Sequence, residues 1–415
     1  MTPVDLLRTP VGEEALAAAA GLADTESPAA GSALRRRFGA ELAAAALDQT
    51  ALRRRARTKF GPSAATLWFT RAGLEQATRP RVAAQRAERY AAAMPPGARV
   101  ADLGCGIGTD ALALVAAGMS VIAVEVDPDT AAVARANLAS VGAEVIGADA
   151  GDVVDTVLTE GTGVFVDPAR RTARGRSWDA ADVSPPWPDV LDWLRRAADG
   201  GALGCVKAGP GLPYRLIPAW TEAEWVSDDG DLVELALWAG PGCTPGLRSA
   251  TLVGAGRPSG GDRLALPPGA ADAPPVGAAG VRPVSVGDLL YEPDPAVIRA
   301  GAVDALAGRL GGDEGSVGRV HRDIAYLVGG GDEQRTPFAT VFRVLEILPH
   351  KEKVLRAWVR DHRIGTLEIK KRGVTDDPAR LRQRLRPAGP GRATLVLTPT
   401  PSGARVLVVD RVPGP

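Results

Sequence analysis

The chain has few cysteines, no net charge and no long apolar run. Cys105, Cys205 and Cys243 share neither the spacing of a metal site nor that of a disulfide framework, which favours a reducing compartment. No apolar stretch reaches the length of a membrane span, and residues 4–22 carry acidic side chains where a secretory signal would be basic. We therefore expect a cytoplasmic protein with no membrane partner and no bound metal.

Charge of both signs is abundant, and it is unevenly distributed. Residues 31–90 hold thirteen Lys and Arg against four Asp and Glu, residues 100–165 hold one against ten, and residues 350–386 hold twelve against five. An acidic segment between two basic ones suits an enzyme that holds a cationic cofactor and a polyanionic substrate. Solvated helix faces of an arginine-rich chain are the alternative explanation.

The length of 415 residues exceeds what one hydrophobic core usually holds, so several domains are expected. Helical periodicity dominates residues 1–95, and strand and helix patterns alternate over residues 96–253. Residues 254–285 are dense in Gly, Pro and Ala, which predicts a hairpin and a linker. Residues 286–415 again alternate helix and strand, as a compact α+β module does.

The segment VADLGCGIG, residues 100–108, is the most informative local pattern. A buried strand ends in a turn in which Gly104, Gly106 and Gly108 allow the backbone to enter a helix sharply. The same glycines fit a loose dinucleotide pattern, but Asp102 and Asp110 place carboxylates where a pyrophosphate needs bare amides. The charges therefore favour S-adenosylmethionine, which has an ammonium and a sulfonium and no phosphate, over NAD.

Later strands end in polar residues that should meet at the same edge of a parallel sheet. Glu125 follows the second strand at the distance expected of a carboxylate that accepts from ribose hydroxyls, with Asp127 as the neighbouring alternative. Asp149 and Ala150 follow the third strand, where a turn lies over the adenine. Asp167 follows the fourth.

The motifs DLGCGIGTD, VIAVEVDPDTAAVARANL, GAD and VFVDPARR occur in this order within residues 68–240, and this segment resembles the class I S-adenosylmethionine-dependent methyltransferases. The resemblance implies an α/β, Rossmann-like core whose mostly parallel sheet closes with a late antiparallel pair. It also implies cofactor contacts, to which position adds Thr109 and Ala150. The expected set is Asp102, Gly104, Gly106, Gly108, Thr109, Glu125, Asp149 and Ala150.

The C-terminal module resembles the THUMP-like domain that a bacterial group of these enzymes carries. The resemblance rests on LLYEPDPAVIRAGAVDAL near Leu289, VFRVLEILP near Val341 and GTLEIKKRGV near Gly365. It implies RNA binding by analogy only. The pattern places Lys353, Arg356 and Arg360 on one stripe of a helix and Lys370, Lys371 and Arg372 in a turn, so that one basic surface could hold an RNA backbone.

Methyl transfer depends on positioning the acceptor, and Asp167, Pro168 and Arg170 stand where the fourth strand delivers them. The Asp167 carboxylate can accept a hydrogen bond from an exocyclic amine. Families that methylate such amines usually place an aromatic residue after the acid and two prolines, and this chain has Ala169 and Arg170 instead. Cys205 lies inside the fifth strand, which argues against the cysteine nucleophile of pyrimidine C5 chemistry.

Two further residues have open roles. Residues 184–187 read SPPW and resemble a loop of trimethylguanosine synthases, so Trp187 could stack on a base if the loop folds back. A Pro-Pro helix start with no preceding strand is the simpler interpretation. Lys207, after the fifth strand, could contact a phosphate or the acceptor, or serve as a structural lysine.

The sequence thus predicts a methyltransferase that uses S-adenosylmethionine and acts on a nitrogen of a base in RNA, either tRNA or rRNA. Two alternatives belong to other classes. One is a catalytically silent module that binds cofactor and RNA, and the other is a small-molecule methyltransferase whose basic segments serve assembly.

Overall fold

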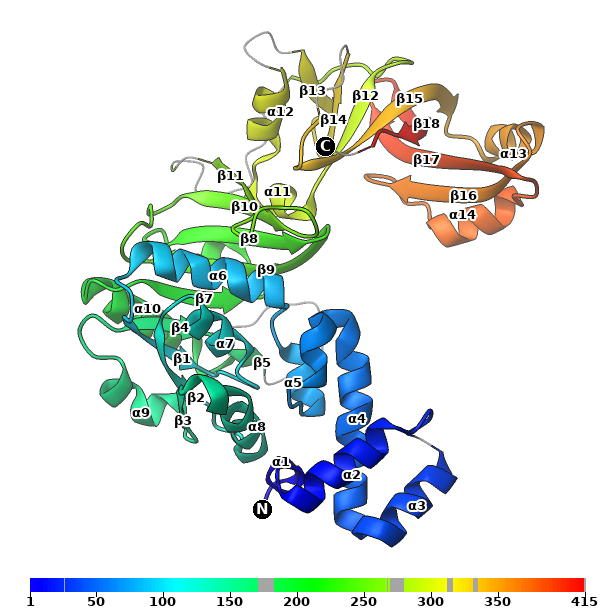
Figure 1. Ribbon diagram of the computed structural model, residues 1–415. Helices are drawn as coiled ribbons and strands as arrows, with labels where there is room; N and C mark the ends of the chain where they lie inside the picture. The colour runs from blue at the N-terminus through cyan, green and yellow to red at the C-terminus, as the bar shows by residue number, and fades with distance from the viewer. Residues whose placement is uncertain are drawn as a thin grey trace. The chain divides into compact units, whose positions relative to one another are not determined.

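The computed structural model describes residues 1–25, 27–170, 183–266, 268, 280–311, 316–330 and 335–413, and it forms two compact units (Figure 1). The first unit comprises Met1–Glu222, Glu234–Pro245 and Val253–Gly261. The second comprises Ala223–Val233, Gly246–Leu252 and Asp262–Pro415. The division into four regions that the sequence suggests stays a prediction.

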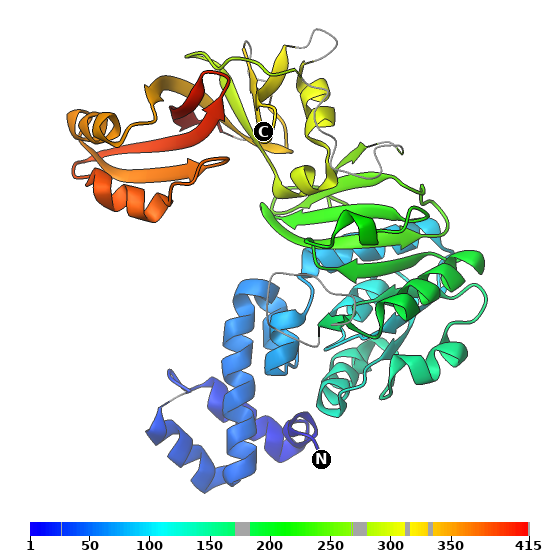
Figure 2. The ribbon, with the colours of Figure 1, turned by 180° about the vertical axis from the view of Figure 1, so that it is seen from behind.

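The first unit begins with helices that pack small apolar side chains against one another. Thr9 accepts a hydrogen bond from the Gly12 N–H at 3.1 Å and Pro10 opens the next helix, as the Thr-Pro pair predicts. Ala43 and Ala46 are fully buried and let the longest helix approach its neighbours closely, as Figure 2 shows from behind. These helices are α1 (Pro3–Leu7), α2 (Pro10–Ala20), α3 (Pro28–Phe38), α4 (Ala40–Phe60), η1 (Gly61–Ala65), α5 (Arg71–Gln76) and α6 (Pro80–Ala93).

A mostly parallel sheet follows, in the order β9-β7-β4-β1-β2-β3 within this unit. Apolar runs form its strands because both faces are covered by helices. β9 pairs antiparallel with β7, which confirms the late antiparallel element. The elements are β1 (Arg99–Leu103), α7 (Thr109–Ala116), β2 (Ser120–Val124), α8 (Pro128–Leu138), η2 (Ala139–Val141), β3 (Glu144–Ile146), α9 (Ala150–Val157), β4 (Gly163–Val166), α10 (Trp187–Asp199), β7 (Gly204–Ala208), η4 (Tyr214–Leu216) and β9 (Asp231–Ala239).

Strand order reverses between β1 and β4, because β2 and β3 lie on one side of β1 and β4 and β7 on the other. Leu103 at the end of β1 is in register with Val124 of β2 and with Val166 of β4. The loops after these three strands therefore begin at one edge. A crevice outside that edge is where open α/β sheets bind ligands.

The second unit contains β8 (Glu222–Asp228), β10 (Arg248–Val253) and β11 (Asp262–Leu266), in the order β11-β10-β8, and a seven-stranded sheet in the order β13-β14-β12-β15-β18-β17-β16. Leu355 and Trp358 of α13 pack on one face of the seven-stranded sheet, and Tyr326 and Phe342 belong to the core on the other. The remaining elements are β12 (Leu289–Pro293), α11 (Pro295–Ala300), α12 (Val303–Gly311), β13 (Val317–His321), β14 (Ile324–Gly329), β15 (Ala339–Pro349), α13 (Glu352–Asp361), β16 (Ile364–Lys371), α14 (Pro378–Leu385), β17 (Gly391–Thr400) and β18 (Gly403–Arg411).

Candidate active site

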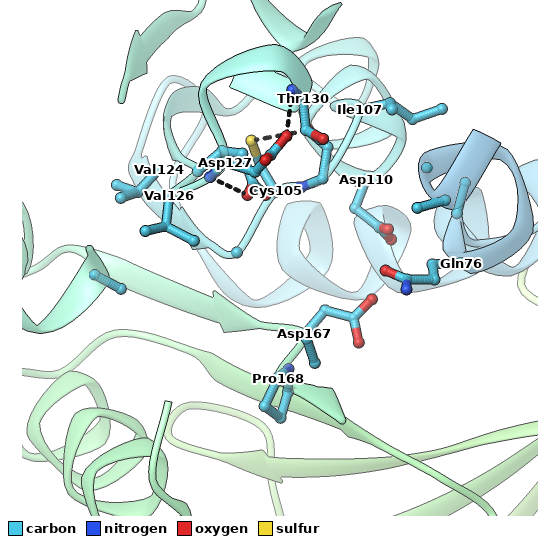
Figure 3. A pocket seen from close by; sticks show the side chains of 18 of the residues that line it. Gln76, Cys105, Ile107, Asp110, Val124, Val126, Asp127, Thr130, Asp167 and Pro168 are labelled. Atoms are coloured by element: carbon cyan, nitrogen blue, oxygen red, sulfur yellow. Dashed lines mark hydrogen bonds between the residues drawn. The ribbon is translucent and has the colours of Figure 1, made fainter. Parts of the chain in front are cut away.

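A cavity of about 840 Å³ opens at the strand-order reversal of the first unit (Figure 3). Its size is ordinary for a small-molecule site. Residues from the glycine turn and from the ends of β2, β3, β4 and β7 line it, together with a wall formed by α5 and the residues after it. Of the expected cofactor contacts, Gly104, Gly106, Thr109, Glu125, Asp149 and Ala150 line the cavity.

The three glycines of the turn all have a positive φ, and each meets different surroundings. An added Cβ on Gly106, at φ 56°, meets nothing within 4 Å, so this backbone faces open cavity. On Gly104, at φ 85°, the Cβ lies 3.2 Å from the Asp167 carbonyl oxygen. On Gly108 it lies 3.1 Å from the Leu138 side chain. Gly106 therefore forms the cradle, while Gly108, which is not a lining residue, serves close packing.

Asp102 occupies an unexpected position, because it lies beneath the cavity rather than in its wall. Asp102 is fully buried, and neither of its carboxylate oxygens has a hydrogen-bond partner among the described residues. Burial raises the pKa of Asp102 well above its ordinary value, and the neighbouring Asp110 and Asp167 raise it further. Asp102 therefore does not line the cavity, and its role as a cofactor contact stays a prediction.

Glu125 and Asp127 both line the cavity, but their carboxylates have different tasks. Glu125 accepts from the Gly106 N–H and the Asp127 N–H, each at 2.9 Å. Asp127 caps α8 by accepting from the Thr130 N–H at 2.8 Å. Hydrogen bonds from the Thr130 side chain and N–H lower the pKa of Asp127. Glu125 thus fixes the glycine turn from the cavity side.

We expect Glu125→Ala to weaken cofactor binding by a few kcal/mol at most, because a hydrogen bond to a charged group contributes about 1.5–3 kcal/mol. Asp127→Ala removes a helix cap, so it should lower the free energy of unfolding by about 0.5–2 kcal/mol and affect cofactor affinity less. Titration calorimetry and thermal unfolding of both variants measure the two effects. A larger loss of affinity in the Asp127 variant contradicts the assignment of Glu125.

The opposite end of the cavity holds Asp167, Pro168 and Lys207. The Lys207 ammonium lies 2.6 Å from Oδ2 of Asp167 and 3.1 Å from Oγ1 of Thr78. Figure 3 shows the side chains of Asp167, Asp110 and Gln76 turned toward one another across this end. The arrangement places a carboxylate, one oxygen of which is bonded to a cation, where an acceptor group can approach.

The helix start that the Pro-Pro pair predicts is present, because α10 begins at Trp187. The expected absence of a strand before it is wrong, because Ser184 ends the short strand β6 (Val183–Ser184), which pairs antiparallel with β5 (Ala169–Arg170). Ser184 and Pro185 line the cavity. Trp187 is the first residue of α10, is only 5% exposed and is not a lining residue, so it does not provide a stacking surface there. Arg170 belongs to β5 by its backbone, and its side chain lies outside the described part of the chain.

The wall that α5 and the residues after it form was not predicted from the sequence. Thr70, Gly73, Gln76 and Thr78 line the cavity. A Cβ on Gly73 would lie 2.2 Å from the Ile107 side chain, so the wall packs directly on the glycine turn. The glycine at position 73 is visible in the sequence, but the sequence does not show that the Ile107 side chain requires it.

Arg86 and Asn137 are two buried polar residues that position the site and to which no role was assigned from the sequence. Arg86 of α6 forms an ion pair with Asp110 and a second one with Glu234 of β9. In the second pair a guanidinium nitrogen lies 2.5 Å from Oε1 of Glu234. The guanidinium also lies over the Phe165 ring. Asp110 is therefore already paired with a cation.

Asn137 of α8 joins the wall to the glycine turn. Its amide donates to the carbonyls of Trp68 at 3.0 Å and Ile107 at 2.8 Å, and its oxygen accepts from the Trp68 N–H at 2.8 Å. All three bonds are short-range contacts between segments that are distant in sequence. Such a fully satisfied buried amide holds both backbones in one arrangement.

The C-terminal basic residues do not form the single surface that the sequence suggested. Lys370 and Lys371 belong to β16, so their side chains point to opposite faces. Lys370 bonds Glu292 at 2.7 Å, and Arg372 lies over the Tyr326 ring on the same side. Lys353, Arg356 and Arg360 stand on α13, which covers the other face, and carboxylates already bind Arg356 and Arg360.

Comparison with known proteins agrees with this geometry. Residues 339–411 match the family model described as THUMP domain-like, and residues 2–56 match a domain of unknown function. The chain is 33% identical over 380 residues to uncharacterized S-adenosylmethionine-dependent methyltransferases from two strains of Mycobacterium tuberculosis, which covers 89% of this chain and 96% of each relative. The chain belongs to the S-adenosylmethionine-dependent methyltransferases.

The fold is shared with a solved structure as well. The crystal structure of a candidate methyltransferase from Porphyromonas gingivalis W83 superposes with a TM-score of 0.75 at 23% identity, covering 96% of this chain and 98% of that one. This protein is an enzyme whose cofactor is S-adenosylmethionine. The open cradle at Gly106, the carboxylates around it and the unpartnered Asp102 fit a cationic nucleoside.

No group of three or more His, Cys, Asp and Glu side chains is placed to hold a metal ion in the described ranges. None of the described helices is both long and apolar enough to span a bilayer.

Proposed function

We propose that the enzyme methylates a nitrogen of a base in RNA. The supporting observation is the Asp167 carboxylate at the cavity end, bonded through one oxygen to Lys207. Bound S-adenosylmethionine supplies an electrophilic methyl group on its sulfonium. Asp167 accepts a hydrogen bond from the acceptor N–H, aligns the nitrogen, and takes up the proton that the methylated nitrogen releases.

The surroundings of Asp167 support a flat, uncharged acceptor. Pro168 and Pro185 line the cavity beside it and offer apolar surface to a base, in place of the aromatic residue that related enzymes use. Gln76 lies across the cavity and brings both a donor and an acceptor. The THUMP-like match supports RNA, rather than a free metabolite, as the carrier of that base.

The test uses the purified protein, tritiated-methyl S-adenosylmethionine and total RNA from cells that lack the gene. We expect label in RNA and, after digestion, mass spectrometry that shows one nitrogen-methylated nucleoside. RNA that binds without gaining label would instead identify a silent module. Label that appears only with small-molecule extracts would assign the enzyme to a small-molecule substrate.

RNA binding should depend on exposed C-terminal lysines, among them Lys353 and Lys371, for neither of which an ion pair occurs among the described residues. The double change Lys353→Ala and Lys371→Ala should flatten the slope of log affinity against log salt by about 0.7 for each lost single-strand phosphate contact. Lys370→Ala is the matched control, because Glu292 already binds that ammonium. Filter binding across a salt series gives the slopes, and equal slopes in all proteins would count against this surface.

A further inference from the structure

Lysine is scarce in this chain, and its positions are informative. The sequence contains six Lys against 43 Arg, and only Lys59 and Lys207 precede residue 350. Both contact the wall of the active-site cavity. Lys59 donates to the carbonyls of Leu74 and Glu75 at 3.0 and 3.3 Å, and Lys207 donates to Thr78.

The chemistry of the two side chains explains why arginine does not replace lysine here. An ammonium is a compact charge with three N–H donors that point in different directions, whereas a guanidinium is planar and pairs best with one carboxylate through two parallel hydrogen bonds. Lys207 uses its donors in two directions, toward Oδ2 of Asp167 at 2.6 Å and toward the Thr78 hydroxyl at 3.1 Å. The side chain of Lys207 is 16% exposed, so water competes little for these bonds.

Asp167 depends on this contact for its orientation. Among the described residues, Lys207 is the only side chain that donates to the Asp167 carboxylate, and Asp167 retains 31% exposure toward the cavity. Without a fixed partner, a carboxylate at the end of a strand can rotate about its side-chain torsions. With Oδ2 held, Oδ1 is left for a substrate N–H.

We propose that Lys207 is a positioning residue, whose ammonium fixes the Asp167 carboxylate for the acceptor and ties it through Thr78 to the wall that carries Gln76. Two of the three donors of the Lys207 ammonium are used within the protein, so we assign the side chain to holding Asp167 rather than to binding a phosphate. The kinetic part of this proposal rests on the proposed function. The structural part does not.

Electrostatics agree with a charged Lys207. Burial alone would lower the pKa of Lys207, but Asp167, with Asp110 and Glu234, outweighs burial and raises it despite the opposing charge of Arg86. Lys59, which faces the same region from α4, shows the opposite balance. Burial, with Lys207 and Arg79, lowers the pKa of Lys59 to about 8, although Asp110 acts against this.

The first test needs no substrate. In protein labelled with ¹³C at the lysine side chains, six signals are expected, and single Lys→Arg changes assign them. The pKa of Lys207 should fall in Asp167→Asn, because the charge of Asp167 is the largest of the effects that oppose burial. An unchanged Lys207 titration would overturn the pairing.

The second test separates orientation from binding. Lys207→Met should lower kcat for RNA methylation by about 10²-fold, as a small misplacement of a reacting group does, and leave cofactor affinity unchanged. Lys59→Met is the matched control, since it removes the bonds to the same wall without affecting the Asp167 contact. This variant should raise KM rather than lower kcat. Thr78→Val should lower kcat more than Thr78→Ser does, because Ser keeps the hydroxyl that accepts from Lys207.

The outcomes distinguish this proposal from the proposed function. A loss confined to KM in Lys207→Met, or identical behaviour of the two Thr78 variants, would overturn the positioning role. If RNA gains no methyl group but Lys207 still responds to Asp167→Asn, the proposed function fails and the pairing stands. Calorimetry with cofactor confirms that each variant is folded.

Discussion

Replacing Asp167 by Asn should lower the rate of RNA methylation by about 10²–10⁴-fold, the usual contribution of a positioned acid or base. The amide of Asn has nearly the size of the carboxylate, but it carries no charge and takes up no proton at neutral pH. Cofactor affinity should remain, because the glycine turn and Glu125 are unchanged. Incorporation of tritiated methyl groups and cofactor calorimetry give the two readings.

Asp199→Asn is the matched control for this variant, since Asp199 is an exposed carboxylate at the end of α10 in the same unit. It should methylate RNA at the parent rate. A variant at position 167 that retains full activity would remove Asp167 from the chemistry and leave positioning to other groups of the cavity.

Replacing Asp102 by Asn should raise the thermal stability of the protein without cofactor, and the gain should grow with pH. The raised pKa of Asp102 in the folded state means that its ionised form is disfavoured there. Below pH 3.8, the ordinary pKa, the carboxyl is protonated in both states and does not reduce the free energy of unfolding. Between pH 3.8 and the pKa in the folded state, the free energy of unfolding falls as pH rises, because only the unfolded state ionises. The steepest possible slope is about 1.4 kcal/mol per pH unit.

Scanning fluorimetry of parent and variant from pH 5 to pH 9 measures this difference, in which every other titrating group cancels. The same variant should bind cofactor more weakly if the buried carboxyl serves the bound cation, so stability and affinity would move in opposite directions. A difference that is independent of pH would mean that Asp102 already has a partner in solution.

Local patterns in the sequence were sufficient for the sheet and for much of the cavity lining. The glycine turn, Glu125 and Asp149 follow directly from strand ends, and parallel strands bring their ends together regardless of distant detail. The position of Asp102 could not be predicted in the same way. β1 is covered by helices on both faces and buries its last four residues, so alternation does not reveal which side chain reaches a ligand.

Long-range partners account for the other differences. Arg86 precedes Glu234 by 148 residues, and no spacing rule links α6 to β9. Trp187 was assigned by the letters around it, whereas the amphipathic helix that it begins directs its ring into the core. Lys370 was expected in a turn beside the basic stripe of α13, but it belongs to β16, whose alternation turns it to the other face, where Glu292 of β12 binds it.

The amide of Asn137 has a thermodynamic meaning beyond packing. One side chain holds the carbonyl of Ile107 in the cofactor turn and both polar groups of Trp68 at the foot of the wall. A ligand that favours one arrangement of either backbone biases the other through the same three bonds, and such coupling is reciprocal. If bound cofactor raises the affinity of the protein for its substrate by some factor, bound substrate raises the affinity for the cofactor by the same factor.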